Sequence, residues 1–83
     1  MTAPDWLTRR RGALKLGSDG ETWYVLLDGQ PQYALIPVPV AGKFGCFIKQ
    51  TNNGQRIDDG GRHATAADAV RGGLDDLRKT LGW

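Results

Sequence analysis

The stretch 22–51, TWYVLLDGQPQYALIPVPVAGKFGCFIKQT, decides the fold. It holds three segments rich in β-branched and aromatic residues, which are enriched in strands. Asp28-Gly29 and, more weakly, Ala41-Gly42 separate these segments as two-residue hairpin turns, whose central positions require a positive φ. The stretch therefore predicts three antiparallel strands, at residues 22–27, 32–38 and 43–51.

Two further turns extend this pattern in both directions. Asp19-Gly20 predicts a strand at residues 13–17, and Asn53-Gly54 predicts a short strand at residues 55–58. Turns that recur about every ten residues are typical of an antiparallel meander. We therefore expect four or five strands, each paired with its neighbour in the sequence.

The last segment changes to a helical period. Its apolar positions recur at i, i+4, i+7 and i+11 and so lie on one face of a helix: Val70, Leu74, Leu77 and Leu81. Thr65 is expected to cap the start of this helix, and Gly82 is expected to end it. The apolar face should pack on the sheet, which gives an α+β fold with one C-terminal helix on one face.

Two adjacent glycines lie within the predicted helix. Gly73 flanks the apolar face, where the lack of a side chain allows the helix to approach the sheet closely. Gly72 is expected to point to solvent, where glycine costs about 1 kcal/mol relative to alanine.

The length and composition bound the organisation. With 83 residues, 40% apolar and 24% charged, the chain should fold around one thin core. We predict an N-terminal arm over residues 1–12, which could be mobile, and a single sheet-plus-helix domain over residues 13–83. The arm lacks the apolar core of a signal peptide, and no apolar run is long enough for a membrane helix. These features predict a cytoplasmic protein without a membrane partner.

The turns also predict which residues share a face of the sheet. Two-residue loops at Asp28-Gly29 and Ala41-Gly42 would place Tyr24 opposite Tyr33 and Leu35 opposite Ile48. One face would then form the bed for the helix: Tyr24, Leu26, Tyr33, Leu35, Phe44, Cys46, Ile48 and Ile57. The second face would be apolar as well: Leu14, Leu16, Trp23, Val25, Leu27, Ala34, Ile36, Val38 and Phe47.

An apolar second face needs a cover, because each large side chain left in water forgoes about 1.5–3 kcal/mol. The cover could be the N-terminal segment with Trp6 and Leu7, closure of the sheet into a small barrel, or a second protein chain. The last of these predicts a non-catalytic binding module that pairs with a second copy or with an unknown protein. Four residues form the candidate interface: Trp23, Val25, Ile36 and Val38.

Nucleic-acid binding is the alternative function. In the predicted register Lys43, Phe47, Lys49 and Arg56 share the second face, and an N-terminal cluster could join them: Arg9, Arg10 and Arg11. Sheets that hold single strands combine cations, which follow the phosphates, with rings, which stack on the bases. A net charge of +2 does not demand an anionic partner, so this alternative ranks second.

Catalysis is not predicted. Cys46 is expected to be a small core residue of a strand, and His63 a solvated loop residue. One cysteine and one histidine are too few for a typical zinc site. The adjacent carboxylates Asp58-Asp59 and Asp75-Asp76 point apart on a strand or a helix. The sequence therefore indicates no enzyme, no metal, no cofactor and no small-molecule substrate.

Overall fold

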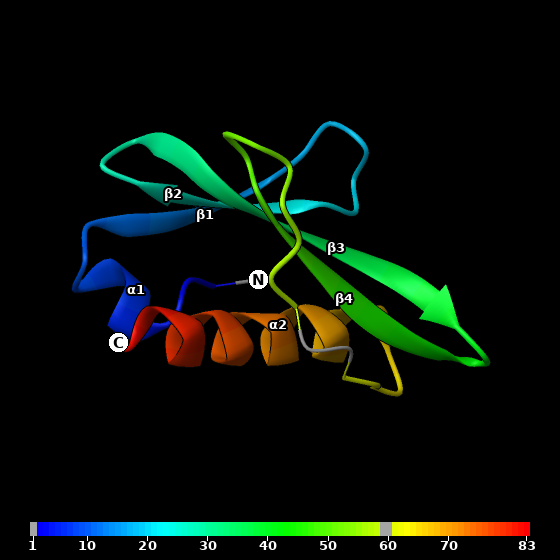
Figure 1. Ribbon diagram of the computed structural model, residues 1–83. Helices are drawn as coiled ribbons and strands as arrows, with labels where there is room; N and C mark the ends of the chain where they lie inside the picture. Colours follow the sequence, from blue (N-terminus) through cyan, green and yellow to red (C-terminus); the bar gives the residue numbers. More distant parts are fainter. Residues whose placement is uncertain (1, 59–60) are drawn as a thin grey trace.

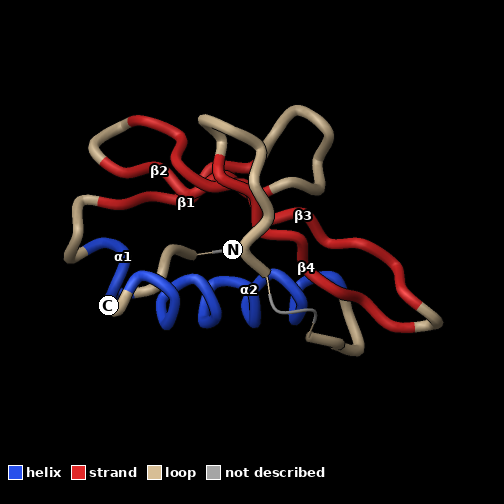
Figure 2. Tube along the Cα trace, viewed as in Figure 1, coloured by secondary structure: helices blue, strands red, loops and turns tan. Residues whose placement is uncertain are grey.

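Four antiparallel strands form one sheet in chain order in the computed structural model, which describes residues 2–58 and 61–83 (Figure 1). The elements are α1 (Asp5–Thr8), β1 (Gly12–Leu16), β2 (Trp23–Leu27), β3 (Gln30–Val40), β4 (Lys43–Gln50) and α2 (Ala66–Leu81). Helix α2 packs across β3 and β4, and α1 lies beside its C-terminal end (Figure 2). The α+β class, the meander and the C-terminal helix on the sheet are confirmed.

Local signals at both ends of α2 set its length. The Thr65 hydroxyl accepts a hydrogen bond from the Asp68 N–H at 3.1 Å. Gly82 adopts the left-handed conformation, and the Trp83 N–H donates to the Arg78 carbonyl, as in a Schellman motif. Between these ends, Val70, Leu74 and Leu77 are buried against the sheet, as their spacing predicts.

The two helix glycines meet different partners. A Cβ atom on Gly73 would lie 2.6 Å from Sγ of Cys46, so the glycine allows α2 to lie directly on β4. The solvent-facing position predicted for Gly72 is wrong, because a Cβ atom there would lie 2.5 Å from Nε2 of His63. The backbone of His63 is fixed by two hydrogen bonds to Phe44, each 2.8 Å long. Gly72 therefore leaves room for the His63 ring above the helix.

We expect Gly72→Ala to destabilise the protein, although alanine is the better helix former. In a His63→Ala background the same change should stabilise it by up to about 1 kcal/mol, because the obstructing ring is gone. Urea unfolding of the four proteins in this double-mutant cycle measures the difference. Equal stabilisation in both backgrounds would show that the ring moves aside freely.

The pairing of β2 with β3 departs from the predicted register. The Asp28-Gly29 turn is a two-residue loop, with Leu27 opposite Gln30, but the register then shifts by one residue at a β-bulge. Leu26 pairs with Pro31 and Val25 pairs with Tyr33, so Gln32 is the extra residue. Pro31 has no N–H to donate to the ladder, and proline in sheets is found mainly at edges and bulges.

This bulge moves the residues of β2 to the opposite faces from those predicted. Leu14 and Leu16 of the paired strand β1 move with them to the helix-covered face. Trp23 and Val25 share the helix-covered face with Leu35, and Tyr24 and Leu26 lie on the other face. The predicted bed for the helix is therefore wrong in β2, although it is correct in β3 and β4. The registers from the Asp19-Gly20 and Ala41-Gly42 turns are confirmed, with Leu14 opposite Val25 and Leu35 opposite Ile48.

Residues 55–58 run beside β4 but do not form a named strand. The Gln50 N–H donates to the Gln55 carbonyl, and the Ile57 N–H donates to the Ile48 carbonyl, each at 2.9 Å. The two-residue loop expected at Asn53-Gly54 is wrong, because the loop spans residues 51–54, with Lys49 opposite Arg56. Asp59, of the predicted pair Asp58-Asp59, lies outside the described residues.

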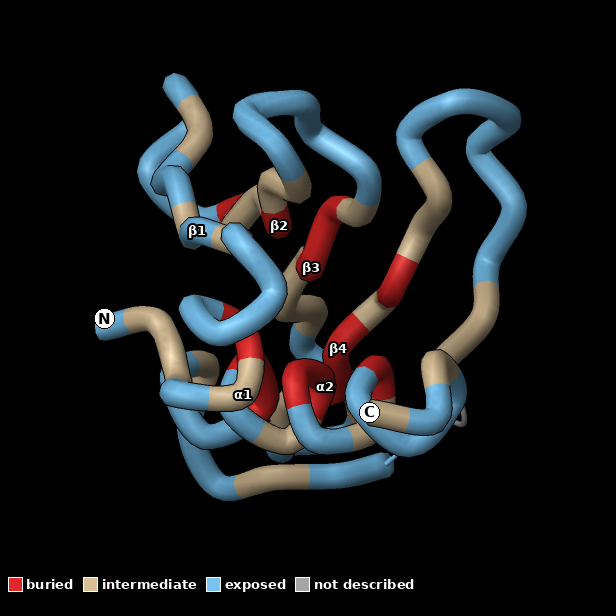
Figure 3. Tube along the Cα trace, turned by 90° about the vertical axis from the view of Figure 1, so that its left-hand side faces the viewer, coloured by how far each residue is buried: buried red, intermediate tan, exposed pale blue. Residues whose placement is uncertain are grey.

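The N-terminal segment joins the core on the helix side. Leu7 of α1 is fully buried, and the ring of Trp6 lies 6.3 Å from the ring of Trp83 at the end of α2. The buried residues of the core therefore lie in β2, β3 and β4 and in the two helices, where the sheet and the helices pack together (Figure 3). Within the described residues, no helix or strand covers the opposite face of the sheet, which we call the outer face.

No helix in the described part of the chain is long and apolar enough to cross a membrane.

Candidate functional site

A single row of five paired residues crosses the outer face. Lys15 of β1 pairs with Tyr24, Tyr24 with Ala34, Ala34 with Lys49, and Lys49 with Arg56. Four steps of about 4.8 Å make this row about 19 Å long. We call these five residues the basic row, because three of them carry a positive charge and none is acidic.

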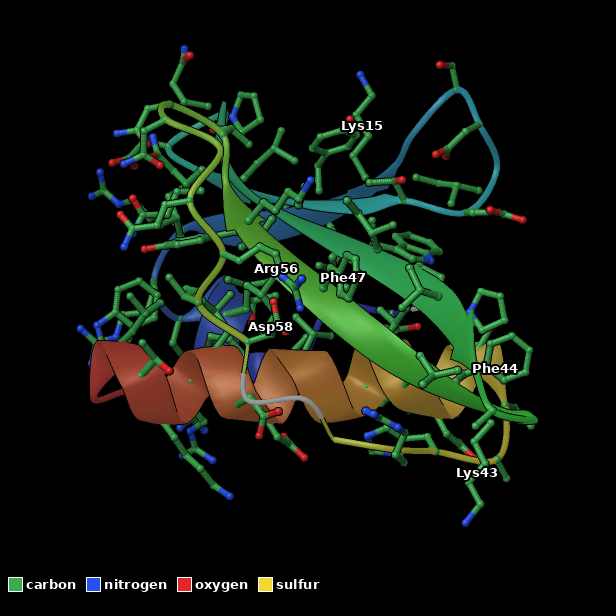
Figure 4. The ribbon with its side chains drawn as sticks, turned by 45° about the vertical axis from the view of Figure 1, so that its right-hand side comes forward. Lys15, Lys43, Phe44, Phe47, Arg56 and Asp58 are labelled. Carbon is green, nitrogen blue, oxygen red and sulfur yellow. The ribbon has the colours of Figure 1, made fainter. Side chains whose placement is uncertain are left out.

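The two lysines of the basic row carry free charges. In the part of the chain that the structure describes, neither Lys15 nor Lys49 has a carboxylate within ion-pair distance. Lys15 is exposed and points away from α2 (Figure 4), and Lys49 is half-buried. Free cations at fixed positions on a face form a surface that attracts anions.

Arg56 is held by two contacts at the other end of the row. Its Nε and Nη2 atoms donate to the two carboxylate oxygens of Asp58, at 3.0 and 2.8 Å. Its guanidinium carbon lies 3.6 Å from the ring centroid of Phe47, which shares the outer face (Figure 4). The guanidinium of Arg56 is therefore held over the face of an aromatic ring by a bidentate ion pair.

Asp58 is itself attached to β4. Its Oδ1 atom accepts the Ile48 N–H at 3.1 Å, and its side chain is 4% exposed. The hydrogen bonds from Arg56, above all, hold the pKa of Asp58 below its ordinary value. The carboxylate therefore stays charged at neutral pH and keeps Arg56 in place.

A hollow of about 590 Å³ opens at the Lys15 end of the row. It lies over β1, β2 and the start of β3, and its lining comprises Lys15, Leu16, Gly17, Ser18, Tyr24, Leu26, Gly29 and Pro31. The basic row has the ring of Tyr24 towards one end, and the guanidinium of Arg56 over the ring of Phe47 at the other. The small side chain of Ala34 lies between them.

The candidate protein interface is divided between the two faces. Ile36 and Val38 lie half-buried on the outer face, as predicted. The outer-face position predicted for Trp23 and Val25 is wrong, because the bulge in β3 places them under the helices. Val25 is fully buried in the core. An interface that uses Ile36 and Val38 stays a prediction.

The candidate nucleic-acid residues also separate. Phe47, Lys49 and Arg56 come together on the outer face. Lys43 lies at the tip of the β3–β4 hairpin, away from Phe47 and Arg56 (Figure 4).

The arginine cluster lies at the opposite end of the molecule from that hairpin tip, between α1 and β1 (Figure 1). Arg10 lies over the ring of Trp83, 4.8 Å from its centroid, on the helix side. Arg9 and Arg11 are its exposed chain neighbours, about 13 Å or more along the chain from Lys15. The structure therefore does not bring Arg9, Arg10 and Arg11 into the basic row.

The two residues considered for nucleophilic chemistry have packing roles. Burial, with a smaller contribution from Asp58, raises the pKa of the Cys46 thiol to about 12, so the thiol is protonated at neutral pH. Cys46 packs against Gly73 in the core, as predicted. The solvated position predicted for His63 is wrong, because its half-buried ring packs over Gly72. Among the described residues, no three histidine, cysteine or carboxylate side chains lie close enough together to hold a metal ion.

Sequence reasoning missed Lys15, Tyr24 and Asp58. The Asp19-Gly20 turn already places Lys15 opposite Tyr24, so these two form a recognisable pair. Lys49 lies in line with this pair only because of the one-residue bulge in β3, which sequence reasoning did not predict. Asp58 has no local signal, because its partners are a side chain two residues away and a backbone N–H ten residues away.

Comparisons with protein-family models, with curated proteins and with solved structures find no match for this chain.

Proposed function

We propose that the outer face binds single-stranded nucleic acid along the basic row. The observation that carries this proposal is the row itself: Lys15, Tyr24, Ala34, Lys49 and Arg56 in register across the sheet. Cations in such an arrangement follow a phosphate backbone, while rings and guanidinium planes stack on bases. The row is about 19 Å long, which is enough for several nucleotides.

The charge of the face favours an anionic partner over a second copy. Two copies packed face to face would bring the free charges of Lys15 and Lys49 into an apolar contact, and unpaired buried charges oppose association. The need for an apolar cover is also smaller than the sequence indicates. Among the described residues, Leu16 is the one large apolar side chain that is substantially exposed (44%).

The rings favour a single strand over a duplex. Stacking on Tyr24 or on the Arg56 guanidinium requires bases that are not already stacked in a helix. A single strand can lie across the sheet with its phosphates on Lys15 and Lys49 and its bases against these planar groups.

Fluorescence anisotropy tests the proposal with a labelled single-stranded DNA of mixed sequence, about 12 nucleotides long. We expect binding that weakens with salt, with a slope of log K against log salt of about −1.4, or about −0.7 for each phosphate neutralised by a lysine. The duplex of the same sequence should bind more weakly. No binding of the single strand at low salt would contradict the proposal.

Self-association is the competing outcome. Light scattering of the protein alone should give a monomer, and Ile36→Lys should leave it monomeric and still able to bind the single strand. A dimer that Ile36→Lys converts into monomers, in a protein that binds no oligonucleotide, would identify the outer face as a protein interface.

A further inference from the structure

We infer that Arg56 is the base-stacking group of the outer face, and that it acts through the plane of its guanidinium rather than through its charge. This inference rests on the proposed function. The residues of the basic row then have different roles: Lys15 and Lys49 contact phosphates, and a base stacks on Arg56.

The first support is that the guanidinium has little freedom to turn. Two parallel hydrogen bonds to Asp58 fix its edge, and the Phe47 ring at 3.6 Å fixes one of its faces. Asp58 is held in turn by the Ile48 N–H of β4. A group that is ordered before its ligand arrives loses little conformational entropy on binding.

The second support is that the Arg56 side chain remains accessible. The Arg56 side chain is 50% exposed, although it contacts both Asp58 and Phe47. Because Phe47 covers one face of the plane, the opposite face is the one available to a flat ligand. Arginine planes stack on unpaired bases in many single-strand complexes.

The third support is electrostatic. The charge of Arg56 is neutralised at close range by Asp58, whereas Lys15 and Lys49 have no such partner among the described residues. A neutralised cation adds little to the counterion release that governs phosphate binding. Arg56 should therefore contribute to affinity without contributing to the salt slope.

Arg56→Lys tests the inference, because it keeps the charge and removes the plane. Binding of the single-stranded 12-mer described above should weaken about tenfold, at the lower end of what loss of one stacked base causes, and the salt slope should not change. A strand of the same length that lacks its bases should bind wild type and Arg56→Lys equally. Arg71→Lys is the matched control, since Arg71 also pairs with an aspartate, Asp68 at 3.1 Å, but lies on α2.

Each outcome has one meaning. Arg56→Lys with wild-type affinity would overturn the inference, as would an equal loss on the strand without bases. In Arg56→Ala, which removes the charge as well as the plane, a slope less steep by about 0.7 would make Arg56 a phosphate contact and would also overturn the inference. Absence of binding by the wild type would instead contradict the proposed function. Helix content by circular dichroism and the urea midpoint of Arg56→Lys show whether the fold is intact.

Discussion

Leu77→Ala should destabilise the protein by about 2–5 kcal/mol, because it removes a fully buried side chain and leaves a cavity. Leu77 lies in the core between α2 and the sheet, together with Leu35 and Ile48. A small domain has a total stability near the lower end of about 5–15 kcal/mol, so the variant should be close to unfolding. In urea its midpoint should fall by about 1 M or more.

Leu16→Ala is the matched control for this change. It removes the same atoms from a side chain that is 44% exposed, and surface substitutions usually change stability by less than about 0.5 kcal/mol. If the two variants had equal midpoints, the packing of α2 on the sheet would be wrong.

The double substitution Lys15→Ala/Lys49→Ala should weaken binding of the single strand by at least about tenfold. The reason is that each lysine is proposed to form a charge-assisted contact to a phosphate, and one hydrogen bond to a charged group contributes about 1.5–3 kcal/mol. The slope against salt should also fall from about −1.4 towards zero. Anisotropy titrations at several salt concentrations measure both effects.

The chain contains its own control for this loss of charge. Its four lysines are Lys15, Lys43, Lys49 and Lys79, of which two lie in the basic row and two do not. Lys43→Ala/Lys79→Ala changes the net charge by the same amount and should keep the wild-type slope. If both double variants weakened binding and reduced the slope equally, the attraction would be diffuse and would not depend on the basic row.

Those parts of the fold that depend on residues close together in the chain could be predicted from the sequence. The Thr65 cap, the left-handed Gly82 and the apolar spacing of α2 are signals within one helix. The turns at Asp28-Gly29 and Ala41-Gly42 are equally local, and both pairs adopt the positive φ that such loops need.

The bulge in β3 could not be predicted from its own residues. Pro31 indicates that a bulge could occur nearby, because proline cannot donate a hydrogen bond to the ladder. It does not indicate which residue of β3 becomes the extra residue of the bulge. In the structure the carbonyls of Pro31 and Gln32 accept hydrogen bonds from the hydroxyl and the N–H of Thr51 at the end of β4. The position of the bulge therefore depends on a residue about twenty positions away.

The bulge changes which residues form the candidate site, because a register shift of one residue moves every side chain of a strand to the other face of the sheet. With Trp23 and Val25 on the outer face, an apolar interface was the better prediction. With Tyr24 there instead, in line with Lys15 and Lys49, the same surface becomes a basic track with rings. The aligned cations depend on pairing across the whole sheet, which no single segment of sequence specifies.

The salt dependence of single-strand binding by the wild-type protein tests the central claim most directly. Anisotropy of the labelled 12-mer is recorded from about 50 to about 200 mM salt, with the duplex measured in parallel. The geometry of the basic row predicts binding with a slope of about −1.4 and a preference for the single strand. No binding at the lowest salt, or equal affinity for strand and duplex, would contradict the claim.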